Sequence, residues 1–290
     1  MKLPDIEYVC PATLDEAVRF LSDGEAKILS GGQSLMPMMA YRLATPSMLV
    51  DIGRIPELNQ IRFSEEGISL GSRVRWRDIE SSARLCTEHP LLCEGIQHVA
   101  HYQIRNRGTV GGSIAHADPA AEMPAIAIAC DARIIAFGTK GWRDIDVGEF
   151  FVGPLMSCLE PTDIVTEIRL PKWPAHRKFA FEEFARRRGD FALAGVCLFY
   201  DLDSDDCAVD PRVVGFGAID MPARIAEVEE FLQGKRIDAA TCELAGSIAK
   251  DAISPSGDLH ASPEYRRSLL GTLVERALIR SIPRETGVKE

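Results

Sequence analysis

Two glycine pairs lie in surroundings that could bind a phosphate group. The first is in SGGQSL, residues 30–35, and the second is in TVGGS, residues 109–113. Glycine lets backbone N–H groups approach a phosphate with no side chain in the way, and a helix that begins nearby adds unpaired N–H groups and its dipole. Hydroxyl residues that can donate to phosphate oxygens or to a ribityl chain flank both pairs: Ser30, Ser34, Thr109 and Ser113. The pattern fits a phosphate or pyrophosphate site and two ordinary tight turns about equally well.

The standard nucleotide-binding signatures are missing from the sequence. It contains no G-x-x-x-x-G-K-[ST] and no G-x-G-x-x-G between a strand and a helix. The nearest match is Gly215-Phe216-Gly217, but Asp220 stands where the third glycine belongs. We interpret this segment as the interior of a strand or a bulge. The two glycine pairs therefore indicate a site of another kind.

The bulk composition excludes several classes of protein. The chain has 290 residues and a formal net charge of −10, which disfavours a nucleic-acid partner because phosphate neutralisation needs excess Lys and Arg. Apolar runs such as MPAIAIAC, residues 123–130, are far shorter than the roughly 20 residues that span a bilayer. The N-terminal residues lack the apolar core of a secretory signal. We expect a cytoplasmic protein without a membrane span.

The cysteine spacing predicts no metal site. The chain has eight cysteines: Cys10, Cys86, Cys93, Cys130, Cys158, Cys197, Cys207 and Cys242. No two of them form a Cys-x-x-Cys pair, so neither a zinc site nor an iron–sulfur cluster is expected. In a chain without a secretory signal they are expected to be reduced thiols in the core.

Hydrophobic periodicity places both glycine pairs between recognisable elements. A capping box, Thr13 with Glu16, begins a helix, and KIL and SMLVDI read as short strands on either side of the first pair. Residues 61–74 and 132–147 each read as a hairpin, and 163–171 as a strand. Helical periodicity is expected in segments 76–86, 90–100 and 120–130.

The pattern of predicted secondary structure changes near Trp173. Beyond it the sequence predicts three strands, at 178–185, 192–202 and 212–219, and then three helices, at 223–233, 239–253 and 263–280. Strands followed by helices without strict alternation are typical of an α+β fold. A softer boundary is expected at 55–60, so we predict domains at residues 1–57, 58–173 and 174–290.

Both glycine segments resemble those of one family. SGGQSLMPMMAYRLATPSMLVDI (30–52), together with QIRNRGTVGGSIAHADPAAEMPA (103–125), closely resembles the FAD-binding, medium subunit of molybdenum hydroxylases, the carbon monoxide dehydrogenase and xanthine dehydrogenase family. The likeness continues through DIVTEIRLP and FARRRGDFALAGV to YRRSLLGTLVERAL. It implies an α+β FAD-binding fold of the vanillyl-alcohol-oxidase (PCMH) type with two subdomains, followed by a domain of three strands and three helices.

The resemblance also implies which residues bind FAD. The pyrophosphate loops carried over from the family are Ser30, Gly31, Gly32, Gln33, Ser34 and Leu35, and Thr109, Gly111, Gly112 and Ser113. Residues expected at the ribityl, ribose or adenine groups are His116, Asp118 and Glu122. Asp190 and Phe191 are expected to approach the isoalloxazine ring, and Ile164 is expected to pack its aliphatic side chain near the cofactor.

Several of these residues have a structural alternative. Asp118, followed by Pro119, could cap a helix, and Glu122 could complement a helix N-terminus. His116 has no companion at metal-ligand spacing, so a hydrogen bond to the cofactor and a structural role stand equal. Other groups with an alternative are Arg105 and Arg107 (phosphate or surface), Met36, Met38 and Met39 (core or cofactor clamp) and Arg186–Arg188 (a solvated or interface patch).

The implied function is electron transfer in an oxidoreductase complex. By resemblance, a large molybdopterin subunit oxidises substrate, a small 2Fe–2S subunit carries single electrons, and non-covalent FAD in this flavoprotein passes them to NAD, a quinone or oxygen. We therefore expect no catalytic acid or base and no metal in this chain, and a dimer of heterotrimers. The alternatives are a stand-alone FAD oxidase of the same broad fold and a non-redox ligand-binding or scaffold protein that has lost FAD.

Overall fold

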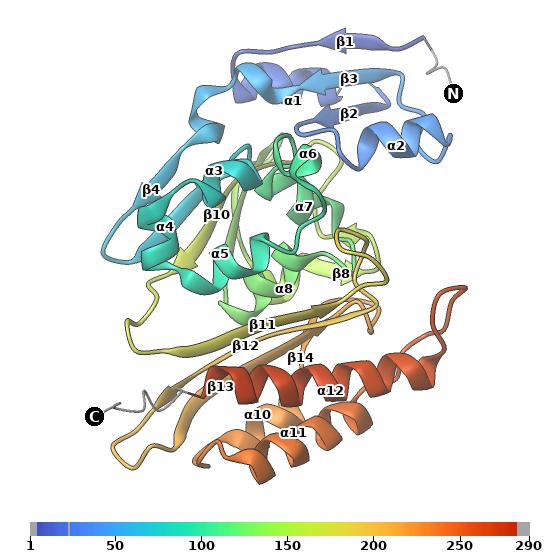
Figure 1. The fold of residues 1–290 in the computed structure, drawn as a ribbon. Helices are drawn as coiled ribbons and strands as arrows, with labels where there is room; N and C mark the ends of the chain where they lie inside the picture. Colours follow the sequence, from blue (N-terminus) through green and yellow to red (C-terminus); the bar gives the residue numbers. More distant parts are fainter. Residues whose placement is uncertain (1–4, 23, 283–290) are drawn as a thin grey trace. The chain divides into compact units, whose positions relative to one another are not determined.

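The chain folds into two compact units. The computed structural model describes residues 5–22 and 24–282. The first unit comprises the chain up to Asp118 together with Cys130–Lys172, and the second comprises Pro119–Ala129 together with the chain from Trp173 onward (Figure 1). A short central segment therefore belongs with the C-terminal part of the chain. The predicted division at residues 57/58 and 173/174 stays a prediction.

A small parallel sheet opens the first unit. Its strands lie in the order β1 (Glu7–Val9), β3 (Met48–Asp51), β2 (Ala26–Leu29), and both outer strands run parallel to β3. Helix α1 (Leu14–Ser22) buries its apolar side chains against Val50 and Ile52. The predicted cap is present, since the Thr13 hydroxyl accepts a hydrogen bond from the Glu16 N–H at 3.3 Å. All three strands end at one edge of the sheet, which is where ligands bind in open parallel sheets.

A five-stranded antiparallel sheet is the larger sheet of the first unit. Its strands lie in the order β4 (Ile61–Phe63), β5 (Gly67–Gly71), β10 (Ile164–Pro171), β6 (Arg133–Gly138), β7 (Gly141–Asp146). The predicted hairpins β4–β5 and β6–β7 are both confirmed. The other elements of this unit are α2 (Leu35–Ala40), η1 (Ile52–Arg54), η2 (Pro56–Asn59), α3 (Trp76–Glu80), α4 (Ala83–Glu88), α5 (Pro90–Ile96), α6 (Tyr102–Arg105), α7 (Val110–His116), α9 (Val147–Phe150), β8 (Phe151–Gly153) and β9 (Met156–Ser157).

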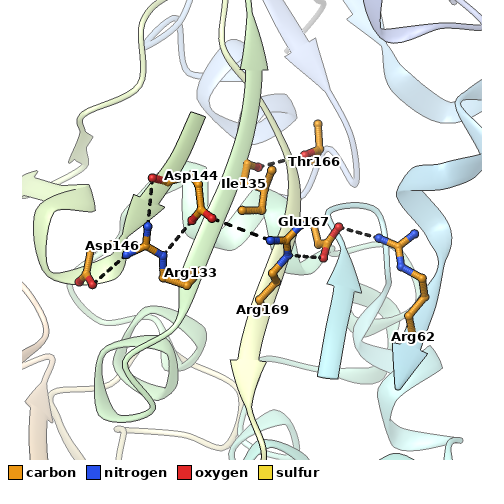
Figure 2. Close-up of polar contacts among 8 residues, drawn as sticks. All are labelled: Arg62, Arg133, Ile135, Asp144, Asp146, Thr166, Glu167 and Arg169. Atoms are coloured by element: carbon orange, nitrogen blue, oxygen red, sulfur yellow. Dashed lines mark hydrogen bonds and ion pairs between the residues drawn. The ribbon is translucent and has the colours of Figure 1, made fainter. Parts of the chain in front are cut away.

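A row of ion pairs crosses this sheet. Figure 2 shows that it links β4, β10, β7 and β6 through Arg62, Glu167, Arg169, Asp144, Arg133 and Asp146. Glu167 accepts hydrogen bonds from Arg62 at 2.6 Å and from Arg169 at 2.8 Å. Burial would raise the pKa of Glu167, but the bonds from its neighbours, Arg169 first, lower it below its ordinary value. The sheet thus keeps a largely buried carboxylate ionised.

The second unit is a four-stranded antiparallel sheet with helices on both faces. The strands lie in the order β11 (Lys178–Phe184), β12 (Ala194–Leu202), β13 (Ala208–Phe216), β14 (Ala223–Arg224). One face packs against α10 (Ala226–Leu232), α11 (Ala239–Ala252) and α12 (Pro263–Ser281), and α8 (Glu122–Ala129) lies on the other (Figure 1). The three predicted strands and three helices are confirmed, and the structure adds β14.

Two details of the first unit differ from the sequence expectation. Segment 76–86 forms two short helices, α3 and α4, where one was predicted. Cys86 and Cys93 form a disulfide, so the prediction that all cysteines are reduced thiols is wrong for this pair. Their Cα atoms lie 5.3 Å apart because α4 and α5 form a tight helical hairpin, a proximity that a seven-residue spacing does not reveal.

Candidate functional site: two glycine loops in contact

The two glycine loops touch each other. The Ser30 and Thr109 hydroxyls, 79 residues apart in sequence, lie within hydrogen-bonding distance at 3.0 Å. A Cβ atom added to Gly31 would lie 2.3 Å from the carbonyl oxygen of Arg107, so only glycine permits this approach. The structure therefore brings together the two segments that the sequence singled out.

The first loop offers free backbone donors. In the described chain, the N–H groups of residues 32–35 donate to no protein acceptor. Gly32 has φ +71°, a left-handed conformation that glycine adopts without strain. The Gln33 side chain donates to the Gly31 carbonyl at 3.0 Å and fixes the turn before α2 begins at Leu35. A row of free N–H groups on a fixed turn is suited to binding an anion.

The second loop has the same dipeptide but no free donors at the start of its helix. The N–H groups of Val110 and Gly111 donate to the carbonyl oxygens of Val74 and Ser72, at 3.0 and 2.8 Å. Those of Gly112 and Ser113 donate to the hydroxyl and the carbonyl of Thr109. In the described chain the backbone N–H groups of residues 110–113 therefore all have protein acceptors, and the predicted contacts of Gly111 and Gly112 with the cofactor stay predictions. What this loop offers is hydroxyl groups and a surface that packs against the first loop.

A helical platform supports the second loop. Trp76, the first residue of α3, donates its backbone N–H to the Gly108 carbonyl at 3.3 Å, and Arg75 pairs with Thr109 as an isolated β-bridge. Arg105 forms an ion pair with Glu80 of α3 at 2.8 Å and donates to two backbone carbonyls, so its role is structural. The disulfide lies one layer further away, where α4 and α5 contact α3.

Arg73 and its neighbours were missed by the sequence analysis. The backbone of Ser72 receives the Gly111 N–H, and the next side chain, Arg73, forms an ion pair with Asp51 at 4.0 Å. Asp51 ends β3 and also accepts hydrogen bonds from Tyr8 at 2.6 Å and from the Gly53 N–H at 2.7 Å. The bond to Asp51, aided by burial, raises the pKa of Tyr8 to about 12. No local motif marks Arg73, because its partner is distant in sequence.

Other predicted residues of the first unit lie at varied positions. His116 is the last residue of α7, and Ala117 after it takes a left-handed conformation with φ +53°. Asp118 does not cap a helix start, because α8 begins only at Glu122. Ile164 is 1% exposed and belongs to the apolar core beneath α1. Their predicted cofactor contacts remain predictions.

Three predicted residues belong to the second unit. Glu122 begins α8, Asp190 lies in the turn between β11 and β12, and Phe191 beside it is 72% exposed. The side chain of Glu183 is close enough to Glu122 for the two charges to interact. Burial, with a contribution from the charge of Glu122, raises the pKa of Glu183 to about 9. Burial and the neighbouring charge thus favour the protonated form of this carboxyl. How these residues relate to the glycine loops remains a prediction.

The site can bind an anionic ligand with a polyol or diphosphate group. It combines free N–H groups on a glycine turn with two hydroxyls, and a buried arginine lies at the carboxyl edge of the parallel sheet where the first loop begins, which fits the diphosphate of FAD. In the described residues, no three His, Cys, Asp or Glu side chains are grouped so as to hold a metal ion. No described helix is long and apolar enough to cross a membrane.

Comparison with known proteins covers nearly the whole chain. Residues 4–173 match the FAD binding domain in molybdopterin dehydrogenase, and residues 179–281 match the CO dehydrogenase flavoprotein C-terminal domain. The chain is 36% identical to 6-hydroxypseudooxynicotine dehydrogenase complex subunit alpha of Paenarthrobacter nicotinovorans, covering 100% of this chain and 99% of the relative. It is 35% identical to the carbon monoxide dehydrogenase medium chain of Hydrogenophaga pseudoflava, covering 95% and 96%.

Solved structures agree with this assignment. The fold matches carbon monoxide dehydrogenase from Hydrogenophaga pseudoflava with a TM-score of 0.93 and 35% identity, over 97% of this chain and 98% of the other. It matches quinoline 2-oxidoreductase from Pseudomonas putida 86 with a TM-score of 0.93 and 33% identity, over the same shares. The predicted FAD-binding domain and C-terminal flavoprotein domain are thereby confirmed. The chain belongs to the FAD-binding subunits of the molybdenum hydroxylases, a family of oxidoreductases.

Proposed function

We propose that this chain is the FAD-carrying electron-transfer subunit of a cytoplasmic molybdenum hydroxylase complex. Its partners would be a large molybdopterin subunit and a small 2Fe–2S subunit, in a dimer of heterotrimers. FAD, when bound, supplies the capacity to collect electrons singly and release them in pairs to an external acceptor. Relatives whose names describe them as medium chains or subunits of dehydrogenase complexes support this assembly.

One observation carries the proposal for the cofactor. The free N–H groups of residues 32–35 lie on a turn that packs directly against the second glycine loop. Backbone donors bind a diphosphate without a protonation step, so they are suited to a cofactor that stays bound while its redox state changes. We propose that residues 32–35 bind the diphosphate and that Ser30, Thr109 and Ser113 orient the polyol chain.

The remaining predicted residues have supporting roles in this proposal. His116, Asp118 and Glu122 would contact the ribityl, ribose or adenine groups. Asp190 and Phe191 would approach the ring system, and Ile164 would pack near the cofactor. None is assigned a proton-transfer step. The chain's own contribution is to bind and orient FAD and to exclude water from it. Substrate oxidation would belong to the molybdenum subunit.

A direct test begins with the purified chain. A flavin spectrum, with the yellow colour released to the supernatant after acid precipitation, is expected for non-covalent FAD; colour retained in the pellet would contradict it. Co-expression with the neighbouring subunits should yield one large partner and one small, iron-containing partner. Addition of the reduced 2Fe–2S partner should then bleach the flavin. Reduction of the flavin by a small alcohol or amine with this chain alone would instead indicate a stand-alone oxidase.

A further inference from the structure

Arg73 is a charged side chain in an unusual setting. The residue is only 8% exposed, and its Nε and Nη1 atoms are buried and make no hydrogen bond in the described chain. Its ion pair with Asp51, at 4.0 Å, is too long for a hydrogen bond. Both carboxylate oxygens of Asp51 already accept other bonds, from the Tyr8 hydroxyl and the Gly53 N–H. The cation is therefore only partly neutralised.

The position of Arg73 connects it to both glycine loops. Its neighbour Ser72 receives the Gly111 N–H at 2.8 Å, and a Cβ atom on Gly111 would lie 2.3 Å from the Ser72 Cβ. On the other side, Asp51 pairs with Leu29 in the parallel sheet, and the first loop begins at the next residue. Arg73 thus lies at the carboxyl edge of the sheet, the edge from which the first loop begins.

A buried cation is unfavourable unless an anion compensates it. Asp51 compensates part of the positive charge of Arg73. The N–H groups of Arg73 that make no hydrogen bond in the described chain show that a second anion could compensate the rest. The anion that the proposed function places at this edge is the FAD diphosphate. Water screens charges poorly in a buried setting, so a cation at this edge can stabilise a nearby anion even without direct contact.

We infer that Arg73 is a positioning residue for the dinucleotide diphosphate, acting as a buried counter-charge behind the first glycine loop and as a tie between the loops. The inference rests on the proposed function, because it presupposes that the diphosphate binds there. It assigns a binding role to a residue outside both glycine motifs.

The test measures flavin affinity and the stability of the flavin-free protein in parallel. Arg73→Met alone strands the Asp51 carboxylate and is expected to destabilise the protein. Arg73→Met/Asp51→Asn removes both charges and should regain most of that stability. FAD affinity of this double variant should still fall at least tenfold, whereas that of riboflavin, which lacks phosphate, should hardly change. Arg73→Lys, which keeps the cation, should retain FAD affinity within about threefold.

A matched control separates this role from general ion-pair loss. Arg143→Met/Asp163→Asn removes an ion pair with a buried carboxylate in the same unit, between β7 and the start of β10. It should leave FAD affinity unchanged. Wild-type affinity for FAD in the Arg73/Asp51 double variant, or an equal loss in the control, would overturn the inference. Failure of the wild-type protein to bind FAD at all would instead overturn the proposed function.

Discussion

The two glycine loops share a dipeptide but use it for different physical ends. Gly31-Gly32 forms a turn with a left-handed residue and leaves a row of N–H groups without protein acceptors. Gly111-Gly112 lies in a helix whose first N–H groups are all bonded within the protein, and Gly111 is there because Ser72 leaves no room for a Cβ atom. Both pairs permit close packing, through Gly31 and Gly111, but only the first also presents free N–H donors in the described chain. A glycine pair therefore indicates that some group comes close to the backbone, and that group can be a ligand or another segment of the chain.

The largest effect is expected from Gly111→Ala. The new Cβ atom would lie 2.3 Å from the Ser72 Cβ and 2.8 Å from its backbone, so α7 must shift. Overpacking of this kind costs about 3 kcal/mol of unfolding free energy, which urea denaturation of the flavin-free protein would measure. Gly112→Ala, at an exposed position that meets only the Thr109 hydroxyl, is the control and should cost much less. Equal losses of unfolding free energy in the two variants would show that Gly111 is not required for packing against Ser72.

Reduction of the Cys86–Cys93 disulfide comes next. The disulfide links α4 and α5, which contact α3 in the helical platform of the second loop, and among the described residues the first loop has no such covalent link. Opening so short a loop is expected to lower the unfolding free energy by about 2 kcal/mol. Thermal melts with and without a dithiol, with Cys86→Ser/Cys93→Ser as the insensitive control, would measure it. An unchanged melting temperature of the wild-type protein in the presence of the dithiol would contradict the expectation.

Gly32→Ala should affect FAD affinity more than it affects stability, which is the opposite of Gly111→Ala. Its Cβ atom meets only the Leu29 and Met36 side chains, both at 3.2 Å, so the main cost is the left-handed backbone, about 1 kcal/mol. Any backbone adjustment would misalign the free N–H groups, so we expect FAD affinity to fall about tenfold. Gly141→Ala, also at positive φ but in the open β6–β7 turn, is the matched control. It should cost similar stability with no change in affinity.

The hydroxyl contact between the loops should give the smallest effects. Thr109→Val removes both the bond to Ser30 and the cap on the Gly112 N–H, at an expected cost of about 1 kcal/mol. Ser30→Ala removes only the shared bond and should cost about half as much. Chemical denaturation of the two single variants and the double variant would give the coupling energy. A coupling near zero would show that the hydroxyls do not hold the loops together.

Local signals in the sequence predicted much of the fold. The Thr13 cap, the β4–β5 and β6–β7 hairpins and the three C-terminal helices each depend on neighbouring residues, and each was confirmed. The contact between the glycine loops came from resemblance and not from spacing. Arg73 escaped notice because its partner, Asp51, is met only after the chain folds. The bonded N–H groups of the second loop escaped for the same reason, since their acceptors come from Ser72 and Val74.

Helix α8 has a consequence for how this polypeptide can be divided. It lies within the segment that matches the FAD binding domain, yet it belongs to the second compact unit, and most of its residues are buried there. The chain therefore passes between the units at residues 118/119, 129/130 and 172/173. A fragment cut at the family boundary would expose an apolar helix and leave one face of the remaining sheet uncovered. Proteolytic nicking near Trp173 should thus leave the two pieces associated until the whole protein is denatured.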